Sequence, residues 1–267
     1  MSYNLENITA TTLPDAWFQT VYKCIETGRD FKIDRGSYAG QKRLEFDHIT
    51  IRIKHPEIRP LLPEIPSQYN IPNPVADGYL EEYLPYLMTS EVKEGESYTY
   101  GSRLTNSLLH RDWFDKLTYK YDDILIQEKD VWGDRNIVKI KNAEYYLNQI
   151  ELCIWTYKNK GFRNNQMTMQ IAKPTDMLLQ DPPCLRSIDT RIQDNKLHFI
   201  VYFRSWDLWN GLPANLGAIQ MMKEYMAAEI GVEVGETIAS SKGLHLYDYV
   251  FELGEILRGK TIEEFRS

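Results

Sequence analysis

The sequence predicts a single α/β domain that spans residues 1–267. Segments with helical periodicity alternate with strand-like segments along the chain, which is the pattern of an α/β fold. Apolar residues make up 43% of the chain and charged residues 26%, as in an ordinary globular protein with a sizeable core. No internal repeat, low-complexity segment or abrupt change of composition marks a linker between domains.

The first part of the chain is expected to contain two helices, a strand and an extended connection. Apolar residues of the segment 15–28 fall on one helical face, and its last residue, a glycine, is a C-terminal stop. The segment 42–53 nearly alternates apolar and polar residues, with a slip of phase at 47–48, as in a strand that carries a bulge. Six prolines between 56 and 74 exclude a central strand or a helix interior there. A second helix is predicted around 77–88.

The middle of the chain contains two further predicted helices. An amphipathic helix is expected near 102–119, directly after the phrase YTYG at 98–101. The clearest helix of this part is 142–158, whose inward face would carry Tyr146 and Cys153.

Strands and a long buried helix are predicted for the last third. The strands are expected at 165–172, 186–193 and 197–204. The turn 194–196, Asp-Asn-Lys, joins the last two as a hairpin. Apolar residues occupy most of the circumference of the helix that starts near Asn215 and closes at Gly231, so it is expected to be buried.

Charge and composition exclude several classes of protein. The chain has 31 basic and 38 acidic side chains and a net charge of −7, which disfavours nucleic acid and anionic membranes as partners. No apolar run approaches the ~18 residues of a membrane span, and the N-terminal segment lacks the order of a signal peptide. We therefore expect a cytoplasmic protein whose three cysteines are thiols. No Cys or His pair has zinc spacing, so no metal is expected.

Cys184 is the cysteine whose sequence context favours chemistry. It follows a rigid Asp-Pro-Pro turn at 181–183 and precedes Arg186. Arginines near a cysteine at the mouth of a strand lower the thiol pKa, so Cys184 is a candidate nucleophile. The alternative, a buried cysteine that acts as a small hydrophobe, stays open. Cys24 and Cys153 lie on apolar helical faces and are expected to fill the core.

The phrase FRSWDLWNGLPAN suggests an anion site. Arg204 and Ser205 offer a guanidinium fork and a hydroxyl donor, which suit a phosphate monoester. Asp207, Gly211 and Asn215 follow on the turn into the buried helix, where free backbone N–H groups also favour an anion. Alternatively, Asn215 is only the N-cap of that helix and Asp207 an ordinary loop charge.

Two weaker motifs complete the set of candidates. His245 and Tyr247 are two residues apart and lie on one side of an extended segment, where both could bind one sugar hydroxyl. A lone His beside a lone Tyr is more often structural. Arg35 lies on a glycine-bearing loop that matches neither a P-loop nor a dinucleotide fingerprint.

In this order, the motifs PPC, RSxD-x3-G-x3-N and HLY resemble the thymidylate synthase family, over most of the chain. The resemblance implies that family's fold, a mixed sheet flanked by helices, and a homodimer in which the sheets of two subunits pack together. It implies a nucleophile at Cys184 and a tyrosine that helps to remove the ring proton at Tyr100. The place of the family's catalytic glutamate falls on Glu82.

The resemblance also implies how a nucleotide is held. The phosphate grip would comprise Arg35, Arg204 and Ser205, with Arg163 from the second subunit. Asp207 and Asn215 would orient the base, and His245 and Tyr247 would bind the sugar hydroxyl.

These residue types fit the chemistry of thymidylate formation. Carbon 5 of a pyrimidine is a poor nucleophile until a thiolate adds to carbon 6 and turns the ring into an enolate. The enolate then attacks the one-carbon unit of 5,10-methylenetetrahydrofolate or a related methylene-tetrahydropterin, which is also the reductant. Asn215 can accept from the ring imino N–H and donate to the adjacent carbonyl, which matches uracil and favours dUMP over dCMP.

The departures from the family pattern define the alternatives. Leu185 stands where the family usually has histidine, and the chain stops at GKTIEEFRS, without the longer tail that closes over folate in the familiar bacterial version. The short form and the phrase DPPCLR resemble archaeal-type synthases. The longer tail excludes water from the reaction when it closes. The alternative enzyme is therefore a dUMP, dCMP or CMP hydroxymethylase, which lets water add to the same intermediate. The presence of Cys184 disfavours a catalytically silent nucleotide-binding relative. The excess of acidic over basic side chains disfavours an RNA-binding regulator.

Overall fold

A six-stranded mixed sheet is the centre of the fold. The computed structural model describes residues 2–34, 38–109, 137–141 and 144–266. The strands follow the order β1 (Leu5–Ala10), β4 (His48–Ile53), β12 (Glu233–Ser241), β10 (Lys196–Phe203), β9 (Leu185–Gln193) and β8 (Thr168–Gln170). The pairs β1–β4 and β10–β12 are parallel and the other pairs antiparallel. The predicted mixed sheet is therefore confirmed.

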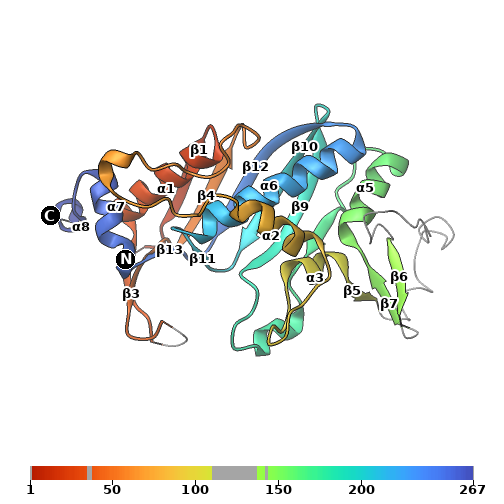
Figure 1. Ribbon diagram of the computed structural model, residues 1–267, viewed down its shortest axis with the longest axis horizontal. Coiled ribbons are helices and arrows are strands. Elements are labelled where there is room, and N and C mark those ends of the chain that lie inside the picture. The colour runs from red at the N-terminus through yellow and green to blue at the C-terminus, as the bar shows by residue number, and fades with distance from the viewer. Residues whose placement is uncertain (1, 35–37, 110–136, 142–143, 267) are drawn as a thin grey trace.

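Helices α1 (Leu13–Thr27) and α6 (Gly211–Ile230) lie across one face of this sheet (Figure 1). Helix α1 packs on β1 and β4, and α6 packs on β10 and β12. The side chains of Phe199 and Val201 point to this face and are fully buried, whereas Ile200, between them, is 40% exposed. Burial of alternate residues follows from the two-residue period of a strand and leaves the second face of the sheet more accessible.

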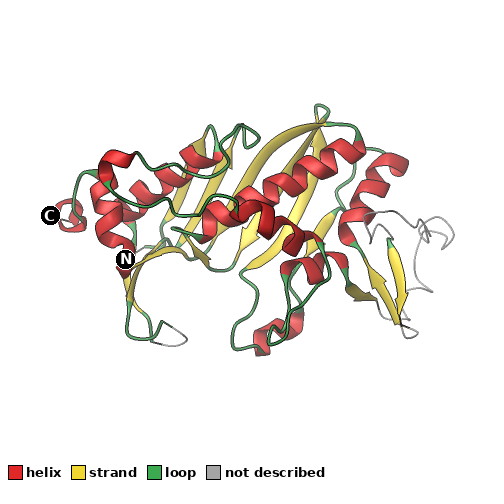
Figure 2. Cartoon of the chain, in the orientation of Figure 1, coloured by secondary structure: helices red, strands yellow, loops and turns green. Residues whose placement is uncertain are grey.

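Shorter elements surround the central sheet (Figure 2). A second sheet has the order β11 (Trp206–Asp207), β13 (Leu244–Tyr247), β3 (Lys42–Glu45) and β2 (Arg29–Lys32). A third has the order β5 (Ser107–Leu109), β7 (Glu144–Leu147) and β6 (Val138–Lys141). The remaining helices are α2 (Tyr79–Met88), α3 (Tyr100–Thr105), α5 (Gln149–Lys160), α7 (Phe251–Arg258) and α8 (Ile262–Arg266). None of the described helices is both long and apolar enough to cross a bilayer.

Most elements with a strong pattern lie where the sequence predicts them. Helices α1 and α2 and strands β8, β9 and β10 all fall within or close to their expected ranges. Asp194 and Asn195, in the predicted hairpin turn, have φ values of 52° and 59°. Helix α6 begins at Gly211, earlier than predicted, because the Asp207 carboxylate accepts from the N–H groups of Gly211 and the two residues before it.

Three predictions about elements are wrong. The segment 42–53 is two strands in different sheets, and the slip of phase marks the crossing between β3 and β4. The predicted helix 142–158 begins as strand β7, and the helix α5 starts only after Asn148, which caps it. The predicted helix 102–119 ends at Thr105 because the next residues pair with β7 as strand β5; residues 110–119 lie outside the described chain.

Candidate active site

A cavity of about 710 Å³ contains the predicted nucleophile and two of the predicted phosphate-binding residues, Arg204 and Ser205. Cys184 immediately precedes β9, and Arg204 and Ser205 immediately follow β10. Because β9 and β10 are antiparallel, the start of one meets the end of the other. The Arg204 backbone N–H donates to the Cys184 carbonyl at 2.8 Å. Tyr247, at the end of β13, lines the same cavity, which we call the thiol cavity.

Burial, more than the arginines, controls the protonation of Cys184. The thiol is half-buried, and desolvation raises its pKa above the ordinary value. Arg204 and Arg186 lower this pKa, but their effect is smaller than that of burial, and Asp181 raises the pKa further. The prediction that neighbouring arginines lower the net pKa is therefore wrong for the free protein. The burial of Cys184 depends on contacts with other segments, which the local sequence around it does not show.

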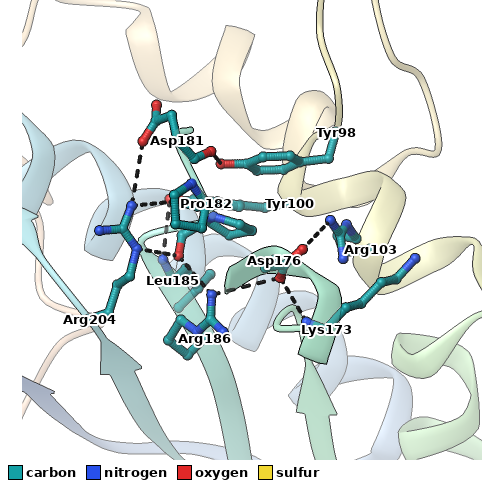
Figure 3. A network of polar contacts seen from close by, with 11 residues as sticks. Tyr98, Tyr100, Arg103, Lys173, Asp176, Asp181, Pro182, Leu185, Arg186 and Arg204 are labelled. Atoms are coloured by element: carbon teal, nitrogen blue, oxygen red, sulfur yellow. Dashed lines mark hydrogen bonds and ion pairs between the residues drawn. The ribbon is translucent and has the colours of Figure 1, made fainter. Parts of the chain in front are cut away.

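The Arg204 guanidinium is held against the turn that precedes Cys184 (Figure 3). Its Nε donates to the Pro183 carbonyl at 3.1 Å, and its Nη2 donates to the Pro182 carbonyl. Nη2 also lies 3.4 Å from Asp181 Oδ1, whose side chain is 92% exposed. The Arg204–Asp181 pair is thus a weak, solvated ion pair that a bound anion can replace.

We expect the variant Asp181→Asn to lower the pKa of the Cys184 thiol, because it removes a negative charge that opposes ionisation. The pH dependence of alkylation by iodoacetamide, followed by peptide mass analysis, measures this pKa. At a pH below the thiol pKa, the variant should alkylate faster than the original protein.

The variant Asp194→Asn is the matched control, because it removes the same charge at the opposite end of the β9–β10 hairpin. Its alkylation profile should match that of the original protein. Identical profiles for Asp181→Asn and the original protein would contradict the expected effect. Burial raises the pKa of Cys24, and that of Cys153 to about 12, so these thiols react slowly and the signal reports Cys184.

Two tyrosines of the YTYG phrase lie beside the thiol. The Leu185 backbone N–H donates to the Tyr100 hydroxyl at 3.3 Å. Burial and the neighbouring Cys184 raise the Tyr100 pKa, so this phenol keeps its proton at neutral pH. The Tyr98 hydroxyl donates to the Asp181 carbonyl at 3.2 Å, and burial raises its pKa to about 12. The structure thus places both Tyr100 and Tyr98 close to Cys184.

A second cavity, of about 430 Å³, contains Asn215 and Asp207. The Asn215 Oδ1 accepts from the Trp206 indole N–H at 3.0 Å, and its Nδ2 donates to the Tyr83 hydroxyl at 3.0 Å. Burial raises the pKa of Asp207, although three backbone N–H groups donate to its carboxylate. Asp207, which lines the second cavity, pairs with His245 on β13, two residues before Tyr247, which lines the thiol cavity.

His245 and Tyr247 lie side by side on β13, with ring centroids 4.7 Å apart. His245 is 2% exposed, and its Nδ1 lies 2.8 Å from the Gly243 carbonyl. Burial lowers the pKa of His245 to about 4, so the ring is neutral at pH 7. Because a carbonyl only accepts, Nδ1 carries the proton and Nε2 is an acceptor. This buried Nε2 has no hydrogen-bond partner in the described chain.

The structure does not bring every predicted residue to these cavities. Glu82 is exposed on α2 and lines neither cavity. Arg163 is exposed in the loop after α5 and also lines neither. Arg35 lies outside the described residues. Tyr38 and Arg43, which both follow Arg35 in the sequence, line the thiol cavity and were not singled out from the sequence.

Sequence reasoning also missed a row of tyrosines on α2. The rings of Tyr79 and Tyr83 stack at 5.7 Å, and those of Tyr83 and Tyr86 at 5.9 Å. Tyr83 and Tyr86 line a third cavity, of about 260 Å³, together with Tyr98 and Tyr100. The spacing of the three tyrosines places them on one helical face, which is the signal that could have identified them. No metal-binding group of three His, Cys, Asp or Glu side chains occurs among the described residues.

Comparison with known proteins adds an independent finding. The family model described as thymidylate synthase matches residues 106–261. A Methanosarcina mazei protein named "Putative thymidylate synthase" is 27% identical over 255 residues, which cover 94% of both chains. A Methanothermobacter thermautotrophicus protein of the same name is 23% identical over 267 residues, 96% of this chain and 98% of its own. A Corynebacterium aurimucosum "Thymidylate synthase" is 30% identical over 115 residues, 42% of each chain.

Proposed function

Because the chain belongs to the thymidylate synthase family, we propose that it methylates dUMP reductively to dTMP, with a methylene-tetrahydropterin as carbon donor and reductant. One observation carries this proposal: the Cys184 thiol shares a cavity with Arg204, Ser205 and Tyr247. A thiol, an anion-binding pair and a polar aromatic side chain are what covalent catalysis on a nucleotide monophosphate requires.

The phosphate binds to Arg204 and Ser205 in this proposal. The guanidinium exchanges its weak contact with Asp181 for the phosphate, which is the stronger acceptor. Arg35, together with Tyr38 and Arg43, would complete the phosphate-binding site. The sugar hydroxyl donates to His245 Nε2, a buried acceptor that has no partner in the described chain, and so satisfies it. The same hydroxyl also forms a hydrogen bond with the Tyr247 hydroxyl.

The covalent step begins when the Cys184 thiol loses its proton to solvent water. Its sulfur then forms a bond to carbon 6 of uracil, and the electron pair of the C5–C6 double bond moves into the C4 carbonyl to form the enolate. Arg204 and Arg186 stabilise the thiolate, since both lower its pKa. In this proposal Tyr100, which is protonated and next to Cys184, relays the proton that leaves carbon 5 to solvent rather than acting as a free base.

The tyrosine row fits an aromatic one-carbon carrier. Stacked rings of Tyr79, Tyr83 and Tyr86 present aromatic faces next to Tyr100 and Asn215, and planar rings such as pterins stack on such faces. The carrier supplies the one-carbon unit and the hydride. These tyrosines would hold it near the pyrimidine and exclude water from the reacting carbon.

A homodimer completes the proposal, with residues 1–267 as one domain. On the accessible face of the central sheet, Ile200 and Ile238 are neighbours on β10 and β12, and Ile200 is 40% exposed. This pair of isoleucines on an accessible sheet face supports packing of the sheets of two subunits. Arg163, which is exposed and does not line the thiol cavity of its own subunit, would then reach the phosphate of the partner subunit.

A hydroxymethylase that acts on dUMP, dCMP or CMP is the second candidate, and one observation favours it. Helices α7 and α8 pack on α1 and line none of the three cavities. The described C-terminal helices therefore do not cover the site, and water would have access to the exocyclic methylene stage of the reaction.

Mass analysis of the products from dUMP and 5,10-methylenetetrahydrofolate tests both candidates. A methyl product is expected, whereas a hydroxymethyl product would support the second candidate. With 5-fluoro-dUMP, which cannot lose a proton from carbon 5, the protein should accumulate as a covalent adduct through Cys184. The variant Cys184→Ala is the control and should form no adduct. Nucleotide binding without adduct or product would identify a non-catalytic relative.

A further inference from the structure

The side-chain amide of Asn215 is fixed at both ends by aromatic residues. The Trp206 indole N–H donates to Asn215 Oδ1, and Asn215 Nδ2 donates to the Tyr83 hydroxyl, each at 3.0 Å. Each end of the amide keeps one further hydrogen-bonding position, since the oxygen has a second lone pair and the nitrogen a second hydrogen. The amide can therefore be fixed by the protein and still present one acceptor and one donor to a ligand.

The two partners of this amide are not equivalent. An indole N–H only donates, so it must face the amide oxygen. A phenol hydroxyl donates or accepts, so Tyr83 would bond equally well to the oxygen of a flipped amide. Of these two partners, only Trp206 distinguishes the oxygen end of Asn215 from the nitrogen end.

The indole of Trp206 is itself held rigidly. The side chain is 3% exposed, and its ring stacks on Phe203 with centroids 3.9 Å apart and an interplanar angle of 5°. Its backbone N–H donates to the Gly243 carbonyl at 3.1 Å, and β11 pairs with β13 at Trp206 and Leu244. The donor that faces Asn215 is thus fixed by both the backbone and the packing of the ring.

We propose that Trp206 is a positioning residue that makes the site selective for uracil over cytosine, by fixing which end of the Asn215 amide is the oxygen. This inference rests on the proposed function, in which Asn215 meets the base. Uracil presents an imino N–H donor beside a carbonyl acceptor, and cytosine presents the reverse pattern. A flip of the Asn215 amide would exchange the two patterns, and the bond to Trp206 opposes that flip.

The test compares Trp206→Phe with the matched control Tyr83→Phe. Each variant removes one hydrogen bond from the same amide and keeps an aromatic ring, but only Trp206→Phe removes the bond that depends on orientation. The ratio of kcat/KM for dUMP to that for dCMP should fall at least about tenfold in Trp206→Phe. In Tyr83→Phe, kcat/KM for both nucleotides should fall by similar factors, so the ratio should stay within about threefold of the original value.

An unchanged ratio in folded Trp206→Phe would overturn the inference, as would equal losses of the ratio in both variants. A measurement made without nucleotide separates failure of this inference from failure of the proposed function. The Trp206 indole N–H resonance, assigned by its loss in Trp206→Phe, should shift in Asn215→Ala, and an unshifted resonance would overturn the inference. If the resonance shifts and the original protein prefers dCMP or uses neither nucleotide, the assignment of dUMP fails while the amide bond is confirmed.

Discussion

Replacement of Cys184 by alanine should abolish conversion of dUMP while nucleotide binding remains largely intact. In the proposed mechanism the thiol forms the covalent bond that activates carbon 5, and loss of a nucleophile of this kind lowers kcat by about 10⁴-fold or more. The groups proposed to hold the nucleotide, Arg204, Ser205 and Tyr247, are unchanged in the variant. Mass analysis of the product at a fixed time measures turnover, and calorimetry measures the dUMP Kd, so the two effects are separated.

The variant Cys153→Ala is the matched control for this prediction. It removes a thiol from α5 that is 3% exposed and whose pKa burial raises to about 12. We expect it to retain turnover per folded molecule, at a small cost in stability from the lost packing. Undiminished turnover in Cys184→Ala would exclude a covalent mechanism through this thiol.

Replacement of Asn215 by aspartate should reverse the preference for the base. A carboxylate accepts from the exocyclic amino group of cytosine and has no donor for the carbonyl of uracil. The Trp206 indole can still donate to the carboxylate, so the side chain should keep its position. The ratio of kcat/KM for dCMP to that for dUMP should rise by about 10²-fold or more, measured with each nucleotide alone and in competition.

Asn215→Ala provides the comparison for that change. Alanine removes the donor and the acceptor together, so both nucleotides should react slowly and with little preference. A preference for dUMP that survives in Asn215→Asp would remove Asn215 from the contact with the base. Because the alanine variant lacks the polar group altogether, it also shows how much of the preference comes from the remaining shape of the cavity.

Much of the architecture could be predicted because the signals were local. The helix α1 carries its apolar stripe and its stop within one segment, and the β9–β10 hairpin carries alternation on both sides of an Asp-Asn turn. That hairpin also explains why part of the candidate site was predictable. Cys184 and Arg204 flank neighbouring antiparallel strands, so their proximity follows from the hairpin alone.

The remaining features depend on contacts between distant segments. Strand β7 has helical periodicity in isolation and is a strand because it pairs with both β5 and β6. The alternation of 42–53 does not say that β3 and β4 belong to different sheets. The bonds from Asn215 to Trp206 and Tyr83 join β11, α6 and α2, and no pattern within one segment predicts such a meeting.

The hydrogen bond from the Arg204 backbone N–H to the Cys184 carbonyl ties these two residues together, so the site would select its ligand by length. Cys184 and Arg204 flank adjacent strands of one sheet, so in the proposed reaction the distance between the reacting sulfur and the phosphate-binding residues follows largely from the strand register. In the proposed reaction, a nucleoside would be too short to reach both Cys184 and Arg204, and a diphosphate would extend past Arg204. A nucleoside monophosphate would have the length that lets the pyrimidine ring reach Cys184 while its phosphate reaches Arg204.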